Sequence, residues 1–371
     1  MRKSLPGKRI VACGTLVALL AATTAAPASA TTTTSPVQAS LDALTAQDGV
    51  PGAEAVIQDH GRTRVVRSGR GDVATGKPFP RNGSFRAGSV TKTFVATVVL
   101  QLVAEGRVKL DAPVERYLPG LLPDKRITVR QLLQHTSGLY NYTDDLPLND
   151  PESLRHLGAD PAELVVMALK HPPLFAPGTD WSYSNTNYIV AGMIAERVTG
   201  HALTDEIGRR ITRPLGLRDT YLPRRGDEKL PEPHAVGYVR VDGNLVDFSD
   251  YETTMAWAAG GLVSTPADLD RFYGALLGGQ LLRPAQLAEM QRTVPAGLGI
   301  PGARYGLGLG SIPLSCGEFW GHEGGILGFT NLAGVGPQGR RVTVVLNQNP
   351  TPAAANQHML AATDAALCSG K

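Results

Sequence analysis

The sequence predicts an α/β fold in which both ends of the chain contribute strands to one antiparallel sheet, which helices flank. A mainly helical lobe is expected at about residues 111–235. Two observations lead to this prediction. Short apolar or β-branched runs occur before residue 90 and again after residue 235, while helical segments separated by Pro and Gly occupy the middle. A chain of 371 residues can bury a substantial core, as one two-lobed domain or two modest domains.

The first thirty residues have the pattern of a secretory signal peptide. Basic residues occur between positions 2 and 9, an almost entirely apolar run covers 10–22, and Ala28-Ser29-Ala30 supplies a small-residue cleavage site. A membrane span is the alternative, but the apolar run is too short for one. We therefore expect a signal peptide at 1–30, a disordered lead at 31–39, a folded domain at 40–371, and a secreted protein without a stable membrane anchor.

The expected elements follow in order along the folded domain. A helix begins at 40–46, and strands at 53–57 and 63–68 flank the turn His60-Gly61. Residues 90–103 carry apolar side chains on nearly every helical face, which predicts a buried helix. Further helices are expected at 129–134, 162–169, 188–198, 266–277 and 353–367, and further strands at 235–241, 244–248, 305–309, 328–335 and 341–347.

Charge and cysteine content exclude some functions. The net charge of +3 comes from scattered Lys and Arg, so the sequence has no basic stripe, and it contains no nucleic-acid-binding module. We expect no nucleic-acid partner. After removal of Cys13 with the signal peptide, Cys316 and Cys368 remain; an exported chain with two cysteines favours one disulfide over two free thiols.

Ser89 and Lys92 lie at the start of the predicted buried helix, in the stretch RAGSVTKTF. One helical turn separates them, so both side chains lie on the same face. A serine hydroxyl needs a neighbouring base to act as a nucleophile, and burial lowers the pKa of a lysine so that it can be that base. The helix N-terminus also offers N–H groups to an oxyanion. The alternative is a helix-capping serine beside a solvated lysine.

A second group is the stretch WSYSNTNY, which contains Tyr183, Ser184 and Asn185 before a predicted helix. A phenol beside a lysine ammonium can be held partly ionised and act as a base or proton relay. The amide of Asn185 can donate to a substrate carbonyl. These polar residues could instead only cap the helix that follows.

The third group is WGHEGGILGF, with His322, Glu323 and Gly325 on a predicted strand. Glycines inside a strand indicate close approach of a ligand or another backbone, and the Gly325 N–H is a candidate oxyanion donor. His322 could place a donor or positive charge beside Tyr183 and Lys92, or be an ordinary core histidine. Glu323 could face the site or point outward, because successive strand residues alternate faces.

In this order, Ser-x-x-Lys, Tyr-Ser-Asn and His-x-Gly resemble the motifs of the penicillin-recognising serine hydrolases, which include class C β-lactamases and the secreted D-alanyl-D-alanine carboxypeptidases of actinomycetes. The segments YLPGLLPDKRITVRQLLQHTSGLYNYTDD, YSNTNYIVAGMIAERVTGH and YGLGL are also similar, so the likeness covers nearly all of the mature chain. It implies a β-lactamase/transpeptidase-like fold.

The resemblance also implies a mechanism. Ser89 would attack, Lys92 and Tyr183 would shuttle protons, Asn185 would hold the substrate amide, and the N–H groups of Ser89 and Gly325 would form the oxyanion hole. The set of candidate residues is completed by His322 as a catalytic residue, by Trp257 as a wall of the cleft and by Glu323 in substrate binding. The reaction would be acyl transfer to water through an ester, without metal or cofactor. The resemblance likewise supports a Cys316–Cys368 disulfide.

The chain departs from the carboxypeptidase pattern where a substrate carboxylate would bind. Gly310 stands where an arginine is expected, and Glu323 and Gly325 replace hydroxyl residues. Three functions remain, in order of preference. The first is a D-alanyl-D-alanine carboxypeptidase acting on wall peptides, with Arg304 or another base replacing the arginine. The second is an esterase, an amidase or a D-aminopeptidase whose substrate ammonium pairs with Glu323. The third is a non-catalytic binder of β-lactams or wall peptides. We expect a monomer.

Overall fold

An eight-stranded antiparallel sheet is the main element of residues 35–371 in the computed structural model, which describes residues 1 and 34–369. The chain divides into two units, residues 1–34 and residues 35–371, and the second is described below. Apart from Met1, the predicted signal peptide at 1–30 lies outside the described residues, as do 31–33 of the predicted lead. The strand order is β2-β1-β12-β11-β10-β9-β8-β7.

The helices and strands have the following bounds. The helices are α1 Pro36–Ala46, α2 Thr91–Ala104, α3 Val129–Gln134, α4 Pro161–Ala168, α5 Thr186–Thr199, α6 Leu203–Ile207, α7 Arg213–Leu215, α8 Trp257–Gly260, α9 Pro266–Leu277, α10 Pro284–Met290 and α11 Ala353–Cys368. The strands are β1 Gly52–Asp59, β2 Arg62–Gly69, β3 Phe85–Arg86, β4 Tyr238–Val241, β5 Asn244–Asp247, β6 Val263–Ser264, β7 Val294–Pro295, β8 Arg304–Tyr305, β9 Gly310–Leu314, β10 Gly317–Ile326, β11 Phe329–Val335 and β12 Arg341–Leu346.

Both ends of the chain build the sheet, as the sequence predicted. The N-terminal strand β1 pairs with the C-terminal strand β12, with Ala55 opposite Val344 and Ile57 opposite Val342. Both strands are rich in small and β-branched residues that are buried, which suits strands covered on two faces. The fold class is therefore confirmed: a β-lactamase/transpeptidase-like sheet flanked by helices.

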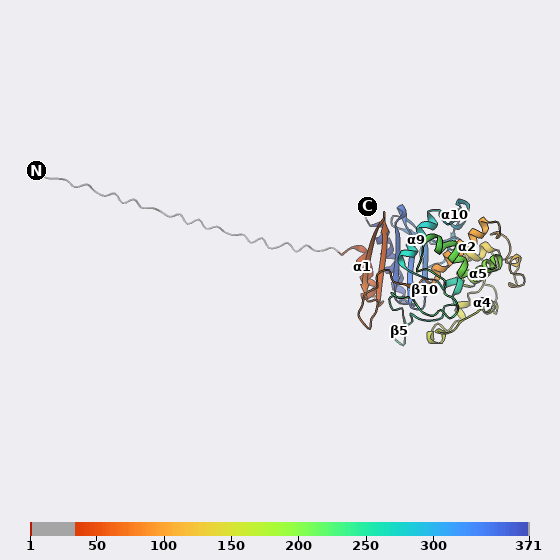
Figure 1. Ribbon diagram of the computed structural model, residues 1–371, viewed down its shortest axis with the longest axis horizontal. Helices are drawn as coiled ribbons and strands as arrows, with labels where there is room; N and C mark the ends of the chain where they lie inside the picture. The colour runs from red at the N-terminus through yellow and green to blue at the C-terminus, as the bar shows by residue number, and fades with distance from the viewer. Residues whose placement is uncertain (2–33, 370–371) are drawn as a thin grey trace. The chain divides into compact units, whose positions relative to one another are not determined.

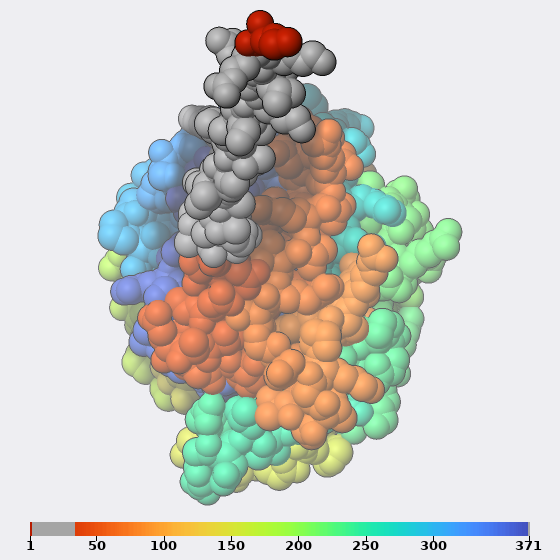
Figure 2. All heavy atoms as spheres, turned by 90° about the vertical axis from the view of Figure 1, so that its left-hand side faces the viewer, coloured from red at the N-terminus to blue at the C-terminus, as the bar shows by residue number. Residues whose placement is uncertain are grey.

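Helices cover both faces of the sheet. On one face α1 and α11 pack together over a core that includes Leu41, Val344 and Met359. Figure 2 views the side of α1, where red and orange N-terminal segments lie beside blue C-terminal ones. On the other face α9 contacts β11 and β12, and α2 and α5 form the larger core beyond it (Figure 1). Nearly every residue of α2 is buried, as its sequence predicted.

Three elements differ from the sequence prediction. Helix α1 begins at Pro36, so residues 36–39 are helical and not part of a disordered lead; the Ser35 side chain caps this helix by accepting from the Gln38 N–H. The strand expected at 305–309 ends at Tyr305. Beyond it, Gly308 has φ +72°, which is not a strand conformation, and packs closely against α2. A Cβ atom on Gly308 would lie 2.5 Å from the Cβ of Ala96.

The third difference concerns the strands predicted after the lobe. Tyr238–Val241 and Asn244–Asp247 pair with each other in a separate two-stranded sheet instead of joining the main one. A disulfide joins Cys316, between β9 and β10, to Cys368 at the end of α11. It therefore ties the last helix to the sheet. Within the described residues, no helix has the length and apolar character that a membrane crossing requires.

Candidate active site

Ser89 lies in a short 3-10 turn, Gly88–Val90, between β3 and α2. Gly88 has φ +54°, and a Cβ on it would lie 2.9 Å from the backbone of Gly325. Glycine is therefore required for β10 to approach the turn so closely. From β11, buried Asn331 donates from Nδ2 to the carbonyls of Ala87 and Gly324, at 3.2 Å each. These contacts fix Ser89 against the strand that carries the third motif.

Lys92 is fully buried beneath Ser89. Its Nζ lies 3.0 Å from Ser89 Oγ, 2.7 Å from Asn185 Oδ1 and 2.6 Å from the Ala259 carbonyl. None of these three partners carries a charge, so nothing offsets the loss of water around an ammonium. Burial accordingly lowers the Lys92 pKa well below its usual 10.5. As a neutral amine it can accept the proton of the Ser89 hydroxyl.

Tyr183 lies beside both residues, with its ring centroid 4.8 Å from Lys92 Nζ. Burial raises the pKa of the Tyr183 phenol above its usual 10, and a hydrogen bond with Ser89 acts in the opposite direction. The partly ionised phenol expected from the sequence is thus not what this environment favours, because burial penalises the charged phenolate. A neutral phenol bonded to Ser89 can still relay a proton.

His322 lies behind Tyr183 on β10, with the two ring centroids 6.5 Å apart. Its Nδ1 is 2.5 Å from the Glu323 carbonyl and its Nε2 is 2.8 Å from the Tyr305 hydroxyl. A carbonyl can only accept, so Nδ1 carries the hydrogen and Nε2 accepts from Tyr305. Burial first, and a charge on Lys92 when that amine is protonated second, lower the His322 pKa to about 3. His322 is therefore a neutral donor and not the positive charge considered from the sequence.

Two cavities meet at Ser89, Asn185 and Gly325, which line both. The wide cavity has a volume of about 560 Å³ and extends over β10 toward α11. The apolar cavity has about 220 Å³ and lies on the other side of Ser89. The β9–β10 ladder ends at Gly321, so the edge of β10 beside the cavities lacks a strand partner there. Its backbone groups, including that of Gly325, are available to a substrate.

Glu323 lines the wide cavity together with Ser89 and Tyr183, so its side chain faces the site. The side chain is exposed within the cavity, and partial removal from bulk water raises its pKa above 4.5. Gly310 lines the same cavity and contributes no charge. Among the described residues that line either cavity, none is Arg or Lys.

Two candidate residues lie elsewhere than the sequence suggested. Arg304 lines neither cavity; its guanidinium donates from Nε to Thr293 Oγ1 at 2.8 Å and from Nη2 to the Thr293 carbonyl at 2.9 Å. Trp257 belongs to the core and does not wall the cleft. Its ring packs against Gly192 of α5, where the missing side chain leaves room for it. The neighbours Ala256 and Ala259 line the apolar cavity instead.

Asn185 holds its place through three contacts. Its Oδ1 accepts from Lys92, its Nδ2 donates to Thr143 Oγ1 at 3.1 Å, and its backbone N–H donates to Asn141 Oδ1 at 2.9 Å. The segment that supplies Asn141 and Thr143 follows α3 in the chain. Thr143 lines the apolar cavity beside Asn185. A substrate amide at Asn185 would therefore meet a side chain whose orientation is already set.

His135 is a residue that sequence reasoning missed. It is fully buried at the end of α3 with φ +60°, and its ring centroid is 4.3 Å from that of Tyr183. Its Nδ1 accepts from the Ser184 N–H at 3.2 Å and from Asn187 Nδ2 at 3.1 Å. Burial lowers its pKa well below 6.5. Its neutral ring thus packs against Tyr183 and holds the loop before α5.

No site for a metal ion is evident at this cleft. Across residues 34–369, no cluster of three His, Cys, Asp or Glu side chains has a geometry that could bind one. The assembled groups are a hydroxyl beside a neutral amine, a phenol and a free strand edge. This arrangement can form and hydrolyse an ester on Ser89.

Comparisons with known proteins agree with this chemistry. A family model described as Beta-lactamase matches residues 37–367. Esterase EstB of Burkholderia gladioli is 34% identical over 54% of this chain, and the match spans 54% of the esterase's own length.

Solved structures cover the chain more fully. The D-stereospecific amidohydrolase of Streptomyces sp. is 39% identical with a TM-score of 0.82, over 91% of this chain and 99% of that one. The D-amino acid amidase of Ochrobactrum anthropi, complexed with D-phenylalanine, is 31% identical with a TM-score of 0.80. The match covers 89% of this chain and 97% of the amidase. These structures have the same fold, and their names describe hydrolysis of amides.

Proposed function

The chain belongs to the β-lactamase family of serine hydrolases, and from this premise we propose that it hydrolyses amides of D-amino acids whose α-ammonium group is free. The observation that carries the proposal is the placement of Glu323 in the wide cavity with Ser89, where the described lining contains no Arg or Lys. A carboxylate there attracts an ammonium and repels a carboxylate. The similarity to D-amino acid amidases supports the same substrate class.

The residues divide the reaction between them. Lys92 accepts the proton as Ser89 Oγ attacks the amide carbonyl, and the N–H groups of Ser89 and Gly325 stabilise the oxyanion. Tyr183 gives its proton to the departing amine, and the proton that Lys92 accepted replaces it. Water then hydrolyses the ester with the same groups acting in reverse, which releases the D-amino acid and restores Ser89. Esters of the same acyl groups fit this mechanism, in keeping with the similarity to an esterase.

A D-alanyl-D-alanine carboxypeptidase fits the site less well. Such an enzyme must bind a terminal carboxylate, and the base that could replace the expected arginine, Arg304, is engaged with Thr293 outside both cavities. Beside Glu323 a substrate carboxylate meets repulsion without a compensating cation. The carboxylate of a penicillin would meet the same repulsion, so we expect slow acylation by benzylpenicillin.

The test compares D-phenylalaninamide with its N-acetyl derivative and with a peptide ending in D-Ala-D-Ala. We expect the free amide to be preferred over both, and Glu323→Gln to reduce that preference at least tenfold. Because the Glu323 pKa is raised above 4.5, the preference should also fall as the pH drops through that raised value and the carboxylate is protonated. Glu318→Gln is the control, since Glu318 is exposed on the same strand and lines neither cavity. Preference for the D-Ala-D-Ala peptide would contradict the proposal.

We also propose that the enzyme works outside the cytoplasm. The basic and apolar N-terminal sequence and the Cys316–Cys368 disulfide support this proposal, because disulfides persist in oxidising compartments. N-terminal sequencing of protein recovered from the culture medium should find a start near Thr31. Recovery of the intact chain from the cytoplasm alone would contradict export.

A further inference from the structure

The apolar cavity beside Ser89 offers a surface that the reaction steps leave unused. It meets the wide cavity at Ser89, Asn185 and Gly325, so a group bound in it lies next to the reacting carbonyl. Six apolar side chains from three separate segments contribute to its wall. These are Leu146, Leu148, Leu154, Met255, Ile326 and Leu327.

Three polar side chains of this wall already have partners within the protein. The Tyr142 hydroxyl donates to the Met255 carbonyl, and the Tyr251 hydroxyl donates to the Leu327 carbonyl at 3.1 Å. The carboxylate of Glu252 accepts from the Gly226 and Thr254 N–H groups at 2.7 and 2.9 Å. A polar ligand group would therefore lose its bonds to water and find few free partners, whereas an apolar group loses nothing. The cavity is chemically suited to a hydrocarbon group.

Its size sets the kind of hydrocarbon. An apolar cavity of about 150 Å³ is known to hold benzene. At about 220 Å³, the cavity beside Ser89 has room for an aromatic ring and its methylene link. We propose that this cavity binds the α-side chain of the acyl residue and that the preferred substrates are D-amino acid amides with bulky apolar side chains, such as benzyl or isobutyl. This inference rests on the proposed function.

The two cavities together also give a physical basis for stereoselectivity. An α-aminoacyl group is then held at three points: its carbonyl at Ser89, its ammonium at Glu323 and its side chain in the apolar cavity. With the carbonyl fixed, inverting the α-carbon exchanges the last two groups. The hydrocarbon would then lie beside the Glu323 carboxylate, which is unfavourable. The ammonium would enter the apolar cavity, whose one carboxylate, Glu252, already accepts two backbone N–H groups. Selectivity between enantiomers should therefore grow with the size of the side chain.

Leu148 offers a test that leaves the core intact. It lines the apolar cavity and is 48% exposed, so truncating it removes part of the wall without opening the interior. Leu174 is a matched control, because it is 49% exposed and lines neither cavity. In the opposite direction, Met255→Trp should fill the cavity. Circular dichroism of each variant establishes that it is folded.

The experiment measures kcat/KM for D-phenylalaninamide, D-leucinamide, D-alaninamide and L-phenylalaninamide. We expect the benzyl and isobutyl substrates to exceed D-alaninamide at least tenfold, since single methylenes in apolar pockets already discriminate by about tenfold or more. Leu148→Ala should lower the ratio of kcat/KM for D-phenylalaninamide to that for D-alaninamide about threefold or more. It should also lower the ratio of kcat/KM for D-phenylalaninamide to that for L-phenylalaninamide. Leu174→Ala should change neither ratio. Met255→Trp should suppress D-phenylalaninamide turnover more than D-alaninamide turnover.

The outcomes separate the two proposals. Equal rates for the three D-amides, or a ratio that Leu148→Ala and Leu174→Ala change alike, would overturn the side-chain assignment and leave the proposed function standing. Failure to hydrolyse any D-amino acid amide, by a folded enzyme whose Ser89 still reacts with a p-nitrophenyl ester, would overturn both.

Discussion

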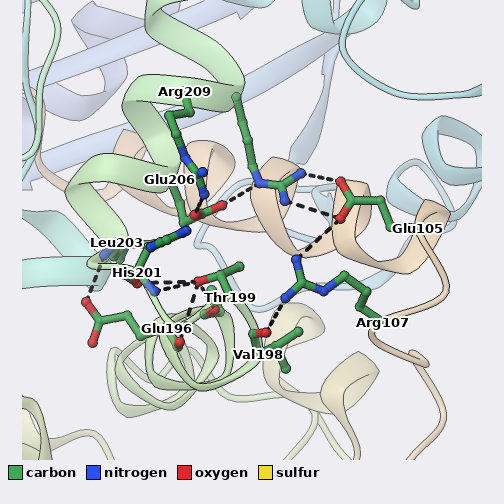
Figure 3. Close-up of polar contacts among 11 residues, drawn as sticks. Glu105, Arg107, Glu196, Val198, Thr199, His201, Leu203, Glu206 and Arg209 are labelled. Carbon is green, nitrogen blue, oxygen red and sulfur yellow. Dashed lines mark hydrogen bonds and ion pairs between the residues drawn. The ribbon is translucent and has the colours of Figure 1, made fainter.

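Two regions of this protein each bury an ionisable side chain completely, and they differ in what surrounds it. Glu206 on α6 is fully buried, and its two oxygens accept from Arg209 and from Arg210 Nε, the latter at 2.6 Å (Figure 3). Lys92 on α2 is equally buried, but its three partners are neutral oxygens. One group is compensated by opposite charge and the other is not.

The difference separates a structural cluster from a reactive one. Around Glu206 the cluster continues outward, because Arg210 also reaches Glu105, which in turn lies near Arg107. The Arg210–Glu105 pair links the segment after α6 to the end of α2, and both oxygens of buried Glu206 have a positive partner. Around Lys92 burial without a counter-charge lowers the pKa of the amine, which favours the neutral form that can accept a proton. The same burial is therefore compensated at one site and produces reactivity at the other.

The largest expected effect is that of Lys92→Met on catalysis. Removing the base should reduce kcat/KM for D-phenylalaninamide by roughly 10⁴-fold or more, as for other nucleophile–base units. The measurement is the initial rate with the circular dichroism spectrum as a check on folding. Ser89→Ala should lose about as much, and the double variant little more, because the two residues act as a unit. Activity within tenfold of wild type in Lys92→Met would remove this lysine from the mechanism.

Glu206→Gln should have the opposite pattern. Loss of the buried carboxylate leaves Arg209 without a counter-charge and leaves Arg210 with Glu105 alone, which should lower the free energy of unfolding by about 2 kcal/mol. Urea unfolding measures this change. Activity per folded molecule should stay within about twofold, since Glu206 lines neither cavity. An equal loss of activity and stability would show that the two regions are not independent.

The spacing within each motif accounts for most of the site that could be predicted. Ser89 and Lys92 share a helical turn, so their contact follows from helix geometry and needs no knowledge of the rest of the fold. The meeting of Lys92 with Asn185 is a long-range contact, which only the resemblance to a known family could supply. The sheet was predictable for a related reason, because its strands are short apolar or β-branched runs, which is a local pattern.

The residues that sequence reasoning missed or misplaced depend on packing between distant segments. A single His135 has no local signal for burial against Tyr183, and its place depends on the loop before α5. Trp257 turns into the core because Gly192 on another helix leaves space for its ring. The ionisation of Tyr183 and His322 likewise depends on how completely other segments exclude water. None of these factors is encoded in the spacing of a motif.

A finer comparison concerns the pH dependence of stability. The Lys92 pKa is lowered in the folded state, so between that value and about 10.5 the unfolded chain binds one more proton at this site. The contribution of Lys92 to the free energy of unfolding is therefore largest above pH 10.5. It is lost as the pH falls toward the pKa that Lys92 has in the folded state. The free energy of unfolding of wild type minus that of Lys92→Met should rise by up to about 1.4 kcal/mol per pH unit. Urea titrations at pH 7, 8 and 9 measure it; a flat difference would mean that Lys92 is charged when folded.

The smallest effect is expected at the exposed end of the Glu206 cluster. Glu105 pairs with Arg210 and Arg107 but is 39% exposed, so solvent screens it and Glu105→Gln should cost less than about 1 kcal/mol of unfolding free energy. The loss should shrink further in 1 M salt, where screening acts over about 3 Å. The cost of Glu206→Gln should persist at that salt concentration, because a buried pair is screened less. An equal response of both variants to salt would mean that burial does not distinguish the pairs of Glu206 from the pairs of Glu105. The contrast between Glu206 and Lys92 would then rest on charge matching alone.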